Sequence, residues 1–262
     1  MELTPEELSV LWAIEEGMSD LEAAFIYTGI EKDKLKPVYE KLEQLGLIKV
    51  TKKFDPFYKE DYWDAVTTKR AKKQLNKKPT KEKKKSAPKK YSLWLMPIGE
   101  DYNKLHNIIL QLSKKHNAPA FEPHVTLIGT LEGDEAGILE KTEKLAAVIS
   151  QYKIELAKVE YLNQYFRCLF IKVNETSDVM NASIKANEIF NVKDDRKYMP
   201  HLSLMYGDFP PEQKEEIIKE IGQEFQSSFE ISSIHLFSTA GNPEKWNRVK
   251  EFQLKEKEQS QV

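Results

Sequence analysis

The chain has 262 residues, of which 40% are hydrophobic and 31% charged, with a net charge of −2, values typical of a globular protein of about two domains. It does not open with the basic start of a signal peptide, and no apolar run approaches the roughly 18 residues of a membrane span. The single cysteine, Cys168, rules out an internal disulfide framework, so we expect a cytoplasmic protein without disulfides or membrane contact.

Three helices are predicted before residue 46. Thr4 and Glu7 form a capping-box pattern at the start of the first helix, and Ser19 with Glu22 repeats that pattern at the start of the second. Apolar residues at helical spacing predict the third helix over residues 33–45.

A strand at 46–51, an aromatic-rich hairpin or wing at 57–66 and a short helix at 67–75 are predicted next. Three helices followed by such a hairpin resemble a winged helix-turn-helix, so residues 1–76 are assigned to a small winged-helix-like domain. Residues 1–68 carry a net charge of −7, which repels phosphate. Binding of nucleic acid and docking of a protein therefore both stay open for this domain.

The segment that follows is strongly basic. Residues 69–90 hold 12 lysines or arginines against one acid, Glu82, a local charge of +11. Its second part, residues 77–90, has no large apolar side chain, which predicts a self-repelling flexible linker. Such a run either contacts RNA or DNA without sequence preference or serves as a solubilising spacer.

Residues 91–255 predict an α+β domain, and residues 256–262 a short C-terminal tail. The pattern places strands near 91–97, 123–130, 152–161, 166–174, 201–206, 228–237 and 246–254, and helices near 101–116, 134–150, 176–190 and 210–221. Two similar motifs, each on a strand after a helix, indicate an internal duplication. We therefore expect two lobes with antiparallel sheets and outer helices, and a cleft between the lobes.

The two motifs lie 77 positions apart and share the pattern Pro-His-apolar-hydroxyl-Leu around His124 and His201. Residues i and i+2 of a strand share a face, so each histidine points the same way as its hydroxyl, Thr126 or Ser203. Side by side about a pseudo-two-fold axis, the motifs would give one cavity two imidazoles and two hydroxyls. This set suits phosphoryl transfer with one histidine as base, the other as acid, and the hydroxyls on the phosphoryl oxygens.

Metal binding is the competing interpretation of two histidines on neighbouring strands. A zinc or iron site requires a third His, Cys or carboxylate beside them, whereas the neighbours here are Thr126 and Ser203. We therefore expect neither a metal nor another cofactor. A single His-x-Thr string on an apolar strand is usually only a half-buried polar pair, and it is the matched repeat that favours catalysis.

The twin strings resemble the His-x-Thr/Ser motifs of the 2H phosphoesterases, in particular the plant and yeast cyclic nucleotide phosphodiesterases. Further stretches match that branch in the same order: Tyr91–Pro97, Tyr165–Phe170, Tyr206 and Trp246–Leu254. The resemblance covers about residues 91–255. It departs from the bacterial RNA-end branch, in which an arginine tends to follow each motif.

The resemblance implies hydrolysis of a cyclic phosphate to a monoester, usually the 2′-phosphate. The implied substrates are a 2′,3′-cyclic nucleotide, an RNA end with a 2′,3′-cyclic phosphate, or ADP-ribose 1″,2″-cyclic phosphate. The family's roles would make His124 and His201 the acid–base pair, with Thr126 and Ser203 on the phosphate and Tyr206 positioning the water.

Two aromatic residues, Trp94 and Phe166, are candidates for stacking on a nucleobase, because an aromatic face accepts any base. As aromatics on predicted strands they are equally expected in the core. Two other functions stay open: a nucleic-acid-associated regulator whose C-terminal domain only binds a nucleotide, and an RNA-end ligase that uses the same site.

Overall fold

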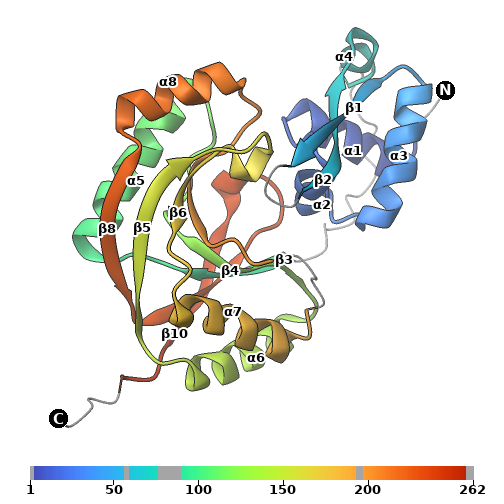
Figure 1. Ribbon diagram of the computed structural model, residues 1–262. Helices are drawn as coiled ribbons and strands as arrows, with labels where there is room; N and C mark the ends of the chain where they lie inside the picture. Colours follow the sequence, from blue (N-terminus) through green and yellow to red (C-terminus); the bar gives the residue numbers. More distant parts are fainter. Residues whose placement is uncertain (1–2, 56–58, 76–89, 193–196, 258–262) are drawn as a thin grey trace.

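The computed structural model describes residues 3–55, 59–75, 90–192 and 197–257. They form an N-terminal and a C-terminal domain that lie against each other (Figure 1). Most of the predicted linker, residues 77–89, lies outside the described residues. Its last residue, Lys90, is not linker, because it is buried and begins the first strand of the C-terminal domain.

The elements of the N-terminal domain are α1 (Pro5–Glu15), α2 (Leu21–Thr28), α3 (Lys32–Gln44), β1 (Ile48–Asp55), β2 (Glu60–Thr67) and α4 (Lys69–Leu75). The helices follow the predicted order, but the hairpin expected within 57–66 is a single strand, β2, which pairs with β1. Thr4 and Glu7 form the expected capping box. The cap of α2 differs from the prediction, since Asp20 accepts from the Ala23 amide while Ser19 donates to Asp64. An aspartate one residue on satisfies the helix start equally well and leaves the serine for this longer-range contact.

The C-terminal domain is an α+β domain, as expected. Its elements are β3 (Lys90–Leu95), α5 (Gly99–His116), β4 (Val125–Glu132), α6 (Glu135–Val148), β5 (Tyr152–Glu160), the 3₁₀ turn η1 (Tyr165–Arg167), β6 (Leu169–Val173), α7 (Ser177–Phe190), β7 (His201–Met205), α8 (Pro211–Ile221), β8 (Glu224–Ile231), β9 (Ser233–Ser238), η2 (Pro243–Lys245) and β10 (Asn247–Gln253). Two details differ from the prediction. The strand expected at 166–174 begins as η1, and the one expected at 228–237 is divided between β8 and β9.

The strands form one antiparallel sheet in the order β10-β9-β3-β4-β7-β6-β5-β8. The expectation of separate sheets in two lobes is wrong in this respect, because the halves join where Val125 of β4 pairs with Leu202 of β7. Each half repeats one strand-helix-strand unit, β3-α5-β4 and β6-α7-β7, with its motif strand at the centre. The arrangement is the one expected of two similar units related by a pseudo-two-fold axis.

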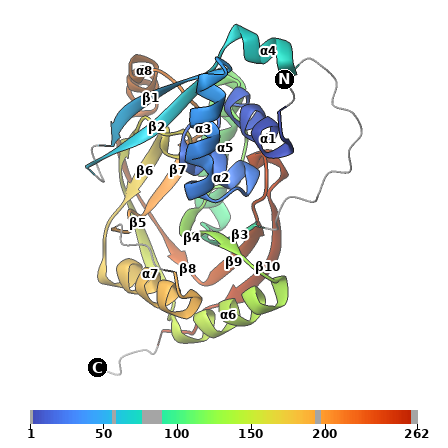
Figure 2. The same ribbon diagram turned by 90° about the vertical axis from the view of Figure 1, so that its right-hand side faces the viewer.

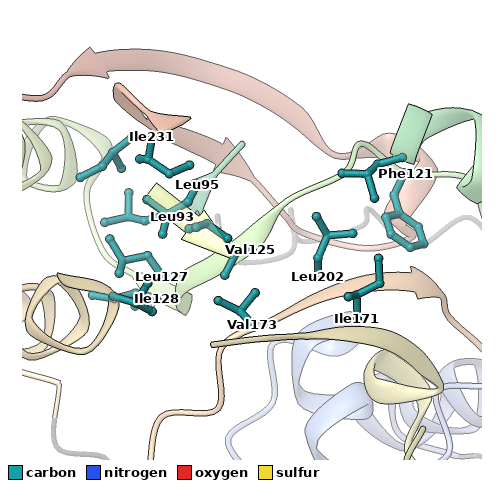
Figure 3. Packing of buried hydrophobic residues seen from close by; sticks show 14 of the residues in the cluster. Leu93, Leu95, Phe121, Val125, Leu127, Ile128, Ile171, Val173, Leu202 and Ile231 are labelled. Carbon is teal, nitrogen blue, oxygen red and sulfur yellow. The ribbon is translucent and has the colours of Figure 1, made fainter. Parts of the chain in front are cut away.

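Two pairs of helices flank the sheet, α5 with α8 and α6 with α7 (Figures 1 and 2). Val125 and Leu202 are fully buried and pack with Ile171, Val173 and Leu127 in the main core (Figure 3). The residues that alternate with them on β4 and β7 must therefore face the opposite side of the sheet. Within the described part of the chain, no helix has both the length and the apolar character needed to cross a membrane.

The N-terminal domain packs directly on the C-terminal domain instead of standing apart from it. Ala13, Met18 and Ala23 are buried in the same cluster as the main core. The Lys90 ammonium donates to the Phe25 carbonyl and lies over the Phe25 ring, 3.5 Å from its centroid. The start of β3 is therefore attached to α2.

Candidate active site

The two motifs meet at the centre of the sheet, where β4 and β7 run antiparallel and Val125 pairs with Leu202. This register, extended by one residue on each side, sets His124 across from Ser203 and Thr126 across from His201. Residues directly opposite have Cβ atoms about 4.5–5.5 Å apart, and diagonal neighbours about 7–8 Å. Each imidazole is thus paired with the hydroxyl of the other motif, and the two imidazoles lie diagonally across the strand pair.

A cavity of about 340 Å³ opens on this face of the sheet. The residues that the sequence singled out line it together: Trp94, His124, Thr126, His201, Ser203 and Tyr206. Phe166 also lines it, from the turn η1 before β6. The cavity has the size of many small-ligand pockets.

Both histidines are oriented by the same local hydrogen bond. The Nδ1 atom of His124 lies 2.6 Å from the Glu122 carbonyl oxygen, and that of His201 lies 2.8 Å from the Met199 carbonyl oxygen. Each carbonyl belongs to the residue before the motif proline, where the chain is held extended. A neutral imidazole that donates from Nδ1 keeps Nε2 as a proton acceptor. The repeated proline therefore helps to fix the tautomer as well as the backbone.

Both imidazoles favour the neutral form in the absence of a ligand. Burial lowers the pKa of His124 to about 3, against the opposing effect of its hydrogen bond to the Glu122 carbonyl, and a charge on His201 would lower it further. Burial also lowers the pKa of His201 to about 4, and the nearby Arg167 charge adds to this. At neutral pH both are therefore proton acceptors until an anion binds beside them.

Trp94 does not offer a face to a nucleobase. Its ring stacks on His124, with centroids 3.6 Å apart and planes 6° from parallel, and also on Phe237 at 3.8 Å. Only 2% of the residue is exposed, and its Nε1 donates to the Ser92 hydroxyl. Trp94 is one of the residues that line the cavity, but of the two roles left open for it these contacts favour the core role, in which its ring supports His124.

Substituting Trp94 tests this supporting role. We expect Trp94→Phe to lower the free energy of unfolding by about 1–3 kcal/mol, because the indole hydrogen bond and part of the packing are lost. An aromatic face remains for His124, so turnover should change little. Trp94→Leu removes that face and should lower turnover further. Equal turnover in the two variants, measured beside urea unfolding curves, would show that the stack does not orient His124.

Ser203, Tyr206 and Phe166 form a connected group beside the second motif. The Ser203 hydroxyl donates to the Phe166 carbonyl at 3.2 Å, and it lies near the Tyr206 phenol, whose pKa it lowers slightly against the larger effect of burial. Burial raises the pKa of Tyr206, so its phenol keeps its proton at neutral pH. Its ring stacks on Phe121 at 3.9 Å, and the partly exposed Phe166 ring meets it edge to face.

Several other residues of the cavity carried no separate sequence signal. Arg167 lies in the stretch Tyr165–Phe170, which had been singled out only as a strand. The Tyr198 phenol donates to the Thr126 carbonyl at 2.8 Å and so links the segment before the second motif to the first. Phe25 and Lys32 reach the cavity from the N-terminal domain, about 100 residues away in sequence, which no local pattern indicates.

No group of three or more His, Cys, Asp or Glu side chains among the described residues is arranged to hold a metal ion. Cys168 is fully buried, and burial raises the pKa of its thiol to about 12. A thiol with so high a pKa is a poor nucleophile. Cys168 is therefore not a candidate nucleophile, which leaves the two motif histidines as the candidates for proton transfer to and from a ligand.

Residues 90–258 match the model of the family described as cyclic phosphodiesterase-like protein. The chain belongs to this family. A cyclic phosphodiesterase of Arabidopsis thaliana is 30% identical to it over 126 residues, which cover 47% of this chain and 68% of the plant protein. The resemblance to 2H phosphoesterases is thereby confirmed for the C-terminal domain, and the protein is an enzyme whose family hydrolyses phosphoesters.

Solved structures resemble this chain more weakly. The E. coli LigT structure in complex with 3′-AMP has a TM-score of 0.48 and 13% identity, covering 64% of this chain and 98% of LigT. The TT0787 protein of Thermus thermophilus has a TM-score of 0.47 and 14% identity, covering 64% of this chain and 99% of its own. At this level of likeness, a ligand bound to another protein says nothing about the substrate of this one.

Proposed function

We propose that this cyclic phosphodiesterase hydrolyses a 2′,3′-cyclic phosphate, or the related ADP-ribose 1″,2″-cyclic phosphate, to a monoester without a metal ion. His124 and His201 act as its acid–base pair. The observation that carries the proposal is the pairing of two neutral imidazoles, each fixed through Nδ1, in one cavity with two hydroxyls. Both have Nε2 available for the proton that each role requires.

One histidine takes a proton from water through Nε2 while the water oxygen attacks phosphorus. The other, protonated at Nε2, gives its proton to the ring oxygen that leaves as the P–O bond breaks. Loss of the 3′ oxygen yields the 2′-phosphate. Since both imidazoles are neutral in the free enzyme, the acid must gain its proton as the phosphate binds, because a neighbouring anion raises the pKa of an imidazole.

Thr126 and Ser203 hold the phosphoryl oxygens in this mechanism, and Tyr206 positions the attacking water. Ser203 has one hydroxyl proton, which it directs to the Phe166 carbonyl in the free enzyme. Binding of phosphate turns that proton toward the ligand. Phe166 lies beside this point with a partly exposed ring, and it is our candidate for contact with a nucleobase.

Removing one of the two hydroxyls should lower kcat/KM less than removing one of the two imidazoles. We expect Thr126→Val and Ser203→Ala each to lower kcat/KM by about 10- to 100-fold, the value of one hydrogen bond to a charged group. Thr126→Ser, which keeps the hydroxyl, is the matched control and should stay close to the parent enzyme. Steady-state kinetics on a cyclic nucleotide measures all three, and an unchanged Thr126→Val would remove Thr126 from the phosphate site.

We also propose that the N-terminal domain is winged-helix-like, on the order of its three helices and the β1–β2 hairpin. Its own charge does not favour nucleic acid, and its α2 and β1 face the C-terminal domain. Its first role in this proposal is contact with the catalytic domain. Unspecific contact of the lysine-rich segment with RNA is a separate proposal that strong salt dependence of binding would test.

The first experiment is incubation with 2′,3′-cyclic AMP in excess EDTA, followed by phosphorus NMR. A 2′-monophosphate resonance that is lost in His201→Ala would support three points: that the cyclic phosphate is hydrolysed, that the 3′ oxygen is the leaving group, and that no metal ion is needed. The same assay then takes an RNA oligonucleotide with a cyclic phosphate end and ADP-ribose 1″,2″-cyclic phosphate. Silence with all three would favour a nucleotide-binding regulator, and joining of RNA ends would favour a ligase.

A further inference from the structure

The cavity extends beyond the two motifs to the N-terminal domain. Phe25 and Ile26 of α2 and Lys32, the first residue of α3, line it together with His124 and His201. A catalytic domain of this family alone would not have this wall, since the match covers only residues 90–258. A ligand bound at the two motifs therefore shares its cavity with side chains of the N-terminal domain.

Three cationic side chains line this cavity, Lys32, Arg167 and Lys197, together with the acids Asp20 and Glu22. Lys197 is paired with Glu175 at 2.6 Å, which leaves Lys32 and Arg167 as the cations considered below. The Asp20 carboxylate is already bound by two backbone amides, those of Ala23 at 2.8 Å and Tyr165 at 3.3 Å. That acid is thus committed to holding the structure.

The N-terminal domain also orients Arg167. Asp55 of β1 accepts from the Gln164 amide nitrogen at 2.6 Å, and the Gln164 amide oxygen accepts from an Arg167 guanidinium nitrogen at 2.9 Å. The Tyr62 phenol donates to the Asn163 carbonyl in the same segment. An arginine supported in this way loses little further freedom when it binds an anion. Its effect on His201 shows that its charge is felt at the motif.

Lys32 reaches the cavity from the opposite domain and pairs there with Glu22. Both side chains remain partly exposed, at 41% and 37%. An exposed pair of this kind contributes little stability, so a phosphate dianion can replace the carboxylate at small cost. Lysine and arginine are the residues that most often bind phosphate groups in proteins.

We propose that Lys32 and Arg167 form a second anion site, which binds a phosphate of the substrate other than the cyclic one. The inference rests on the proposed function and specifies its substrate class: cyclic phosphates that carry a further phosphate or phosphodiester group. The N-terminal domain then takes part in substrate selection, by contributing Lys32 and by holding Arg167 through Asp55 and Gln164.

The test compares adenosine 2′,3′-cyclic phosphate with the same compound carrying a 5′-phosphate, on the full chain. The parent enzyme should show about tenfold higher kcat/KM for the 5′-phosphorylated form, mainly through KM, as one charge-assisted contact provides. Lys32→Gln should remove that preference while leaving the plain substrate unchanged. Lys34→Gln, an exposed lysine two residues on in α3, is the matched control and should keep the preference.

A variant with increased affinity for the 5′-phosphorylated substrate shows that the loss in Lys32→Gln does not come from misfolding. Glu22→Gln frees Lys32 from its carboxylate and should lower KM for the 5′-phosphorylated substrate by a few-fold. A Lys32→Gln loss that is equal for both substrates, or no preference in the parent enzyme, would overturn the second anion site.

Calorimetry separates this inference from the proposed function, because it requires no turnover. Adenosine 2′,5′-bisphosphate should bind the parent chain about tenfold more tightly than adenosine 2′-phosphate, and Lys32→Gln should abolish the difference. That result without hydrolysis would overturn the phosphodiesterase proposal and retain the anion site. Hydrolysis of the cyclic phosphate together with equal binding of the two nucleotides would retain the phosphodiesterase proposal and overturn the anion site.

Discussion

His124→Ala and His201→Ala are each expected to lower kcat on a cyclic phosphate by about 10²- to 10⁴-fold. Each loss removes one of two proton transfers in the same step, from an imidazole whose Nδ1 is already engaged by a backbone carbonyl. Neither of two other titratable groups of the cavity replaces them: burial raises the pKa of Tyr206, and the Asp20 carboxylate, with a pKa of about 6, already accepts from the amides of Ala23 and Tyr165. Steady-state rates with EDTA present provide the measurement.

The double variant gives a sharper result than either single one. If acid and base act together, His124→Ala with His201→Ala should be little slower than the worse single variant, because one missing partner already disables the step. Independent roles would instead multiply the two losses. The double variant therefore distinguishes a coupled pair from two separate binding contacts.

Controls must separate chemistry from folding. His124→Ala exposes the Trp94 face, so a drop in stability is expected there, whereas the ring of His201 meets Phe170 edge to face and is not stacked on it. His124→Gln fills more of the gap and helps to check the fold. His106→Ala, on α5 outside the cavity, should keep full activity. Wild-type rates in either motif variant, with thermal unfolding unchanged, would end the two-histidine mechanism.

The site could be predicted from sequence because its information is local. A strand alternates its faces, so His124 and Thr126 had to point one way and Val125 the other. The repeat at His201 and Ser203 then required only that the two strands be neighbours. That they pair at Val125 and Leu202 within one sheet, and not across two separate sheets, depends on the whole topology. No local pattern carries this information.

Trp94 shows where a local sequence pattern leaves two roles undecided. Its aromatic character and strand position suit either a base platform or a core residue, and only packing decides between them. Stacking between His124 and Phe237 decides for the core. The turn η1 is a second example, because the apolar stretch around Phe166 suits a strand until the N-terminal domain binds Tyr165 and Gln164. These contacts join segments more than about 100 residues apart.

The composition of the chain did not predict that the N-terminal domain packs on the C-terminal domain. Twelve basic residues between two acidic regions predict a flexible separation, and charge repulsion supports that picture. The contacts that oppose it are few and specific: Ala13, Met18 and Ala23 in the shared core, and Asp20 on the Tyr165 amide. Burial of small apolar side chains against a second domain leaves no periodic signal that distinguishes it from burial within the first.

Stability sets the lower end of the pH range in which the enzyme can be studied. Both histidines have pKa values lowered by folding, so the unfolded chain binds more protons between about pH 4 and their ordinary value near 6.5. Stability should therefore fall as pH decreases through that range. Asp20 acts in the opposite sense, because burial raises its pKa to about 6 and the folded chain then binds the extra proton. His235, whose pKa burial lowers to about 4, acts with the two motif histidines, so stability is expected to fall on balance as pH decreases.

Within the stable range, kcat/KM is expected to fall as pH rises from about 5 to 8, by up to about tenfold per unit. The active free enzyme needs one protonated and one neutral imidazole. With pKa values of about 3 and 4, the protonated fraction decreases continuously across that range. The bound phosphate raises the pKa of the acid, so the decline in kcat should begin at higher pH than the decline in kcat/KM.

Arg167→Gln supplies the internal control for this profile. Removing the guanidinium removes one cause of the low His201 pKa, so the decline in kcat/KM should move to higher pH while its slope is unchanged. Lys34→Gln removes a charge of the same sign from the exposed surface of α3 and should leave the profile where it is. Rates on adenosine 2′,3′-cyclic phosphate at constant ionic strength test both. A bell centred near pH 6.5 in the parent enzyme, with both limbs at ordinary histidine values, would mean that water reaches these imidazoles freely and that burial does not control their protonation.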